Sequence, residues 1–103
     1  MISKDTLLSI NLFGSLNPKD WPFTLAELPP GSALVGGSVR DGLLNKLVPK
    51  PDLDFVIPTN AIKFSENLSK KINATFIKLD EKRDIARLVV NGWTFDFASQ
   101  VGE

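Results

Sequence analysis

The feature that most narrows the possible folds is the dipeptide Asn91-Gly92, which separates two strand-like runs of residues. Asn-Gly is strongly favoured in the two-residue turns of β-hairpins, because both residues tolerate a positive φ. The flanking runs, residues 85–90 and 93–98, are rich in β-branched or aromatic residues, and the second alternates with the period of a strand. The sequence therefore predicts an antiparallel hairpin.

Three more strands and two helices are predicted before this hairpin. The strands cover residues 32–35, 52–57 and 74–79, and the helices cover residues 38–47 and the stretch from Thr59 or Asn60 through Ile72. A strand, helix, strand, helix order followed by antiparallel strands indicates two packed layers. We therefore predict an α+β domain, with a mixed five-strand sheet and two or three helices.

Residues 1–30 show weaker patterns than the rest of the chain. They contain four of the seven prolines, together with Trp21 and Phe23. We predict an irregular lead-in that packs on a domain of residues 31–103, with a short helix near Lys4 to Phe13.

Composition excludes several kinds of chemistry. A chain of 103 residues without cysteine or histidine has no disulfides, no Ser-His-Asp triad and none of the usual zinc ligands, so a hard cation held by carboxylates remains open. With 12 basic and 12 acidic residues, the chain lacks the positive field that drives nucleic-acid binding. No membrane span or secretory signal is recognisable, and we expect a cytoplasmic protein with no membrane partner.

Two carboxylates, Asp52 and Asp54, lie two residues apart on a predicted strand, so their side chains share one face. Their mutual repulsion is relieved by solvent or by a bound cation, and oxygen-only ligands of this kind suit Mg²⁺. A pair of solvent-exposed aspartates at a strand edge is the alternative, and the two residues alone do not decide between these readings.

A third carboxylate, Asp96, lies on the last predicted strand, on the face opposite three aromatic side chains. The strand of Asp52 and Asp54 likewise has its bulky apolar residues on the opposite face, so both strands can bury one face and present acids on the other. Three converging acids could hold two Mg²⁺, one activating an attacking hydroxyl and one holding a triphosphate and its leaving pyrophosphate. A solvated hairpin aspartate is the alternative for Asp96.

The turn Gly36-Gly37-Ser38 connects a predicted strand to a predicted helix. Glycine lets backbone N–H groups approach an anion closely, and a helix N-terminus adds a favourable dipole, so a triphosphate fits there. Arg40 would offer phosphate a charged fork. The alternatives are a plain tight turn and, for Arg40, an ion pair with Asp41 or Glu27.

Two blocks of the chain closely resemble the signature of the tRNA nucleotidyltransferase/poly(A) polymerase family, which includes the class II CCA-adding enzymes. They are residues 34–44, Leu-Val-Gly-Gly-Ser-Val-Arg-Asp-Gly-Leu-Leu, and residues 52–57, Asp-Leu-Asp-Phe-Val-Ile. The resemblance extends through residues 95–98, Phe-Asp-Phe-Ala. It implies a DNA polymerase beta-like nucleotidyltransferase fold.

The resemblance also implies roles for single residues. Asp52 and Asp54 match the catalytic ligands of Mg²⁺, and Asp96 matches a third carboxylate that helps to activate the terminal hydroxyl of tRNA. The residues that match the nucleotide-binding turn and its surroundings are Gly36, Gly37, Ser38 and Arg40.

Other segments typical of the family have no counterpart in these 103 residues. They are an Arg-Arg-Asp-Phe-like motif, a Glu-Asp-x-x-Arg template that selects C or A, and the neck, body and tail that hold tRNA. We therefore expect residues 31–103 to be a head domain that ends before those parts and is inactive or poorly active alone.

The leading functional hypothesis is a domain that adds nucleotides (CCA or A) from CTP or ATP to the 3′ end of tRNA or another RNA by two-metal phosphoryl transfer. Mg²⁺ is the expected cofactor, and the tRNA 3′ end would be held through downstream domains. The alternatives are a non-catalytic nucleotide- or metal-binding module of the same fold, and a structural interaction domain in which the acids are incidental.

Overall fold

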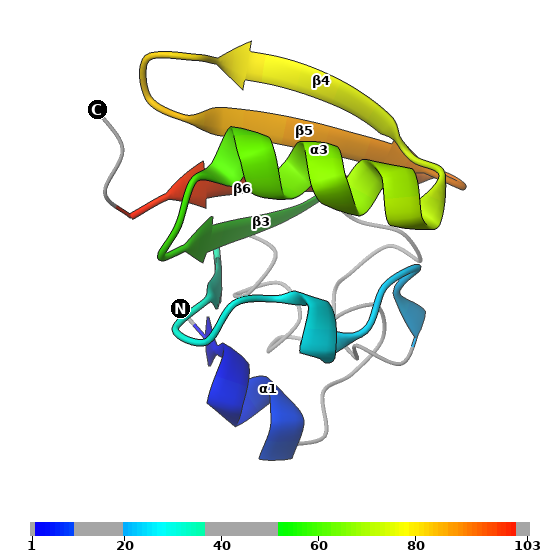
Figure 1. Ribbon diagram of the computed structural model, residues 1–103. Helices are drawn as coiled ribbons and strands as arrows, with labels where there is room; N and C mark the ends of the chain where they lie inside the picture. The colour runs from blue at the N-terminus through cyan, green and yellow to red at the C-terminus, as the bar shows by residue number, and fades with distance from the viewer. Residues whose placement is uncertain (1, 10–19, 37–51, 101–103) are drawn as a thin grey trace.

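The structure is a computed structural model that describes residues 2–9, 20–36 and 52–100 (Figure 1). Its elements are β1 (Ile2–Ser3), α1 (Lys4–Ser9), the 3₁₀ helix η3 (Leu25–Glu27), β2 (Ala33–Val35), β3 (Asp52–Ile57), α3 (Ala61–Ile72), β4 (Thr75–Asp80), β5 (Ile85–Val90) and β6 (Trp93–Ser99). The helix predicted at residues 38–47 lies outside the described ranges.

The described strands form one mixed sheet in the order β1-β2-β3-β6-β5-β4. Strands β3 and β6 pair in parallel, and the other neighbours are antiparallel. This confirms the α+β prediction. The sheet has six strands instead of the expected five, because Ile2 and Ser3 pair with β2 ahead of α1. A strand of two residues is too short to show the alternation by which strands are recognised.

Helix α3 lies across one face of the sheet (Figure 1). Its buried residues Ala61 and Leu68 lie on the apolar stripe that the sequence shows at helical spacing. The N-terminus of α3 is capped by a residue distant in the sequence. Asp84, in the turn between β4 and β5, accepts hydrogen bonds from the Ala61 and Ile62 N–H groups at 2.7 and 2.9 Å. Within the described residues, no helix is long and apolar enough to cross a membrane.

Aromatic side chains fill the space on this face of the sheet. Phe64 of α3 packs edge-on against Phe97 of β6, with 5.2 Å between ring centroids. From the segment before β2, Trp21 lies 5.4 Å from Phe55, and Phe23 lies 4.9 Å from Phe95. One face of the sheet is therefore buried in the core, and the polar side chains of the same strands lie on the other face.

Candidate functional site

The three acids predicted as a site lie on the sheet face opposite the core. In β3, Asp52 and Asp54 alternate with the buried residues Leu53 and Phe55. The parallel register makes Asp54 the partner of Asp96 in β6, and it places Asp52 beside Thr94. Neighbouring strands are about 4.8 Å apart, so Asp54 and Asp96 lie side by side across the two strands.

Arg87 of β5 joins this pair, and it is not among the site residues predicted from the sequence. Arg87 is the antiparallel partner of Asp96. Its guanidinium donates two hydrogen bonds to the carboxylate, from Nε to Oδ1 at 2.8 Å and from Nη2 to Oδ2 at 3.0 Å. The signal was available: a two-residue turn at Asn91-Gly92 pairs residue 90 with 93, and the same register pairs Arg87 with Asp96.

The negative charges of Asp52, Asp54 and Asp96 are only partly balanced by the positive charge of Arg87. Burial raises the pKa of Asp54, the negative charges of Asp96 and Asp52 raise it further, and the Arg87 guanidinium opposes the shift. The hydrogen bonds and charge of Asp96 raise the pKa of Arg87 in turn. Asp54 is therefore a carboxylate whose ionisation the neighbouring acids oppose, which is the setting that a bound cation relieves.

Gly36 is the one predicted phosphate-turn residue that the structure describes, and it lies against Asp54. Its φ of 89° falls in the region that favours glycine. A Cβ at this position would come within 2.7 Å of Asp54 Oδ2, which is closer than real Cβ atoms approach. Gly37, Ser38 and Arg40 lie outside the described residues, so their nucleotide-binding roles stay predictions. Glu27, a suggested partner of Arg40, pairs with Lys71 at 3.1 Å.

A cavity of about 280 Å³ opens beside the acids. It is lined by Val35, Asp54, Phe55, Val56, Ile85, Asp96 and Ala98. Binding pockets of proteins combine largely apolar walls with a few convergent polar groups, and Asp54 and Asp96 supply the polar groups here. Both acids therefore border a single space that a ligand can enter.

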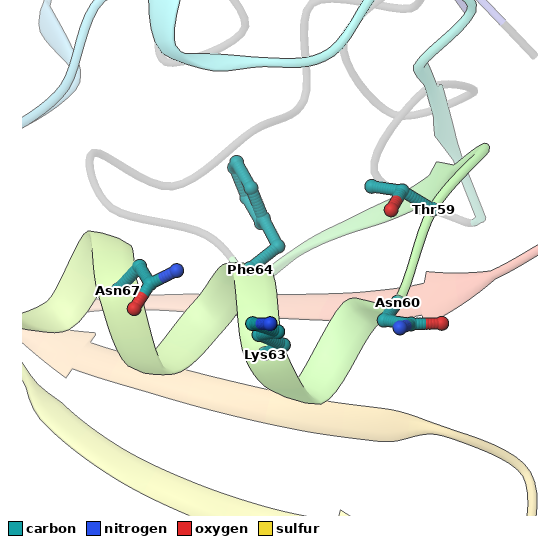
Figure 2. Close-up of a pocket in the computed structure, with 5 residues that line it drawn as sticks. All are labelled: Thr59, Asn60, Lys63, Phe64 and Asn67. Carbon is teal, nitrogen blue, oxygen red and sulfur yellow. The ribbon is translucent and has the colours of Figure 1, made fainter.

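A larger pocket, of about 350 Å³, lies at the first turns of α3 (Figure 2). It is lined by Thr59, Asn60, Lys63, Phe64 and Asn67. None of the three acids borders it. Its lining residues belong to α3 and the segment just before it, and α3 packs on the core face of the sheet, opposite the acids. We therefore place the candidate site at the smaller, acidic cavity.

The donor set at this cavity suits a hard divalent cation. Asp52 and Asp54 offer oxygen ligands on one face, and burial and the neighbouring acids raise the pKa of Asp54, which a bound cation would oppose. Among the described residues, no group of three or more histidine, cysteine or acidic side chains is arranged to hold a metal ion. Asp96 instead directs both oxygens to Arg87. The geometry suits a cation bound through one or two carboxylates and completed by substrate oxygens.

Comparison with known sequences gives a consistent set of relatives. Residues 32–100 match the family model described as Poly A polymerase head domain. The CC-adding tRNA nucleotidyltransferase of Synechocystis sp. is 47% identical over 81 residues, which are 79% of this chain and 20% of that protein. The enzyme of the same name from Geobacter sulfurreducens is 37% identical over 62 residues, which are 60% of this chain and 14% of that protein. This chain thus spans a fifth or less of these relatives.

Solved structures agree with the sequence matches. A tRNA nucleotidyltransferase in complex with a primer tRNA and an incoming ATP analog is 32% identical and superposes with a TM-score of 0.58, covering 66% of this chain and 19% of that one. A CCA-adding enzyme in complex with ATP, also 32% identical, gives a TM-score of 0.59 over 66% of this chain and 16% of that one.

Proposed function

This chain belongs to the Poly A polymerase head domain family, and on that premise we propose that it transfers nucleotides from CTP or ATP to the 3′ end of tRNA. The observation that carries the proposal is the parallel register that sets Asp54 beside Asp96 at one cavity. Phosphoryl transfer depends mainly on positioning and on the stabilisation of negative charge, and acids fixed on one sheet face would hold the cation that stabilises this charge.

Each described residue has a proposed task. Asp52 and Asp54 would hold Mg²⁺, which when bound stabilises negative charge on a triphosphate and lowers the pKa of an attacking hydroxyl. Asp96 would accept a hydrogen bond from the 3′ hydroxyl of the RNA at a carboxylate oxygen. Gly36 keeps the backbone close to Asp54, where a side chain would displace the carboxylate.

The remaining tasks are proposed for residues outside the described ranges and for segments that the longer relatives have and this chain does not span. Gly37, Ser38 and Arg40 are proposed to bind the triphosphate. A chain with a net charge of zero attracts tRNA only weakly. We therefore propose that tRNA is held by segments such as those of the relatives that this chain does not match. The expected cytoplasmic location stays a prediction.

Nucleotide incorporation tests this proposal. The chain would be extended with the remainder of the Synechocystis relative and incubated with labelled CTP and a tRNA that lacks its 3′ end. Asp54→Asn and Asp96→Asn are each expected to lower incorporation about a hundredfold or more, because a held cation and a positioned hydroxyl supply several kcal/mol. Glu66→Gln, which neutralises an exposed carboxylate on α3, is the matched control and should leave the rate unchanged.

The main alternative, a module that binds nucleotide or metal without catalysis, predicts a different result. CTP and Mg²⁺ would still bind, and Asp54→Asn would weaken that binding. The extended protein would incorporate no label at any concentration of enzyme, and this outcome would exclude the transferase proposal.

A further inference from the structure

Arg87 is connected to the acidic site by a contact that fixes geometry as well as charge. Two parallel N–H···O bonds hold the plane of the Asp96 carboxylate, which a single ammonium contact does not do. The Arg87 side chain is 38% exposed and that of Asp96 is 21% exposed, so the pair is partly shielded from water. Asp96 therefore has little freedom to turn away from its neighbour Asp54.

The surroundings of Arg87 leave it directed at this carboxylate. Its cross-strand neighbour on β4 is Ile77, and its neighbours on the same face of β5 are Ile85 and Val89. All three are apolar. Asp96 pairs with Arg87 on one side and with Asp54 on the other. The three side chains therefore lie in a row across the sheet, with the Arg87 guanidinium at one end and two acids beside it.

The charge of Arg87 has two opposite effects on a cation at this site. An arginine side chain is positively charged at every physiological pH. It offsets the repulsion between Asp54 and Asp96 while no cation is bound. It also repels a divalent cation that binds beside Asp54, because like charges a few ångströms apart interact strongly at a partly shielded surface.

We propose that Arg87 is a positioning residue of this site, which holds the Asp96 carboxylate beside Asp54 and keeps the affinity of the site for its divalent cation moderate. The inference rests on the proposed function, since it concerns the same site. It predicts that loss of Arg87 tightens cation binding while nucleotide transfer slows. A purely structural role of Arg87 predicts weaker cation binding on its loss, because a displaced β5 would disturb the acids on the adjoining strands.

Mn²⁺ binding to the chain, measured by calorimetry at low ionic strength, tests the charge effect. Arg87→Gln is expected to bind Mn²⁺ about fivefold to tenfold more tightly than the parent, which is the change that Coulomb's law gives for one charge acting on a divalent ion at about 7 Å in water. Arg87→Lys retains the charge and should bind Mn²⁺ within about twofold of the parent.

Arg83→Gln is the matched control. Arg83 lies in the β4–β5 turn, where its Nε is 3.8 Å from Asp80 and its side chain is 75% exposed. The substitution removes the same charge away from the acidic row, and solvent screens what remains. Mn²⁺ affinity should stay that of the parent, and an equal tightening in Arg83→Gln would show that net charge alone is responsible.

A second pair of variants guards against misfolding of Arg87→Gln, which leaves Asp96 without its partner. Asp96→Asn removes that unpaired carboxylate, and adding Arg87→Gln in this background should again tighten Mn²⁺ binding about fivefold or more. In the extended protein, Arg87→Lys should lower kcat without changing KM for CTP, because the fork that orients Asp96 is lost while nucleotide contacts remain.

Unchanged or weaker Mn²⁺ binding on loss of Arg87, in both backgrounds and in folded protein, would overturn the inference. Failure of the proposed function is distinguishable from this result. It would appear as a parent chain in which Asp54→Asn does not affect Mn²⁺ binding, whatever Arg87 does.

Discussion

At the scale of single residues, Asp54 carries a charge that the fold disfavours. Burial, Asp96 and Asp52 raise its pKa above the ordinary 3.8. Between the unfolded and the higher folded pKa, the native state binds more protons, so the contribution of this group to stability falls as pH rises through that window. Ionised Asp54 therefore lowers the free energy of unfolding at neutral pH.

Asp54→Asn is accordingly expected to raise the free energy of unfolding at pH 7, with a smaller gain at pH 3, where the native carboxyl is already protonated. Urea denaturation at the two pH values measures both gains. A gain that is larger at pH 3, or a loss at pH 7, would contradict the direction of the shift. Glu66→Gln on the exposed side of α3 controls for the general effect of removing one negative charge.

Gly36→Ala tests the close approach of the backbone to the same carboxylate. Positive φ alone should cost about 1–2 kcal/mol of stability in an alanine variant, and the new methyl group would also displace Asp54 Oδ2. Gly31→Ala is the matched control, since its φ is 92° and its added Cβ would meet Pro58 at an ordinary 3.5 Å. Both variants should be destabilised, and only Gly36→Ala should lose Mn²⁺ affinity in calorimetry. Equal Mn²⁺ affinities would mean that Asp54 is not positioned by this contact.

At the scale of elements, α3 depends on a cap that the adjoining hairpin provides. Asn60 stands at the N-cap position without a side-chain hydrogen bond, and Asp84 supplies both acceptors instead. Asp84→Ala is expected to cost about 1–2 kcal/mol of unfolding free energy, as loss of a cap does. Asp84 has a φ of 59°, which asparagine also tolerates. Asparagine also keeps one of the two acceptor oxygens, so Asp84→Asn should cost less than Asp84→Ala in the same denaturation experiment, and equal costs would contradict capping by this side chain.

Strands β2 to β6 and α3 could be predicted closely because each carries either a clear period or an apolar run bounded by turn residues. The run at 52–57 matches β3 residue for residue, and the run at 85–90 matches β5. Strand β1 could not be predicted, because two residues show no period. Capping of α3 by Asp84 could not be predicted either, because the sequence signals that mark the start of a helix are local.

Some contacts of the candidate site could be predicted from the sequence and others could not. The face shared by Asp52 and Asp54 follows from alternation within one strand, and the pairing of Arg87 with Asp96 follows from a two-residue turn. The pairing of Asp54 with Asp96 does not follow from any local pattern. A helix and two strands intervene between β3 and β6, and only the packing of the whole sheet decides which strands become neighbours.

At the scale of the whole molecule, net charge limits what the chain can bind alone. With 12 basic and 12 acidic residues, it gains little from the release of counterions that drives protein binding to RNA. We expect the 103-residue chain to bind tRNA with a Kd weaker than about 100 µM at physiological salt and to add no CCA at an appreciable rate. Fluorescence anisotropy with labelled tRNA measures the affinity. Micromolar binding would place tRNA contacts within this domain.

The location of the cation site on the sheet is the claim on which the proposed function depends, and paramagnetic broadening tests it most directly. Mn²⁺ would be titrated into the isotopically labelled chain while amide resonances are followed, with Mg²⁺ as the diamagnetic reference. We predict that broadening begins at Gly36, at residues 52–54 and at residues 95–97, and that Asp54→Asn abolishes it. Broadening that begins instead at the pocket of Asn60, Lys63 and Asn67, or that persists in Asp54→Asn, would contradict a nucleotidyl-transfer site on the acidic face.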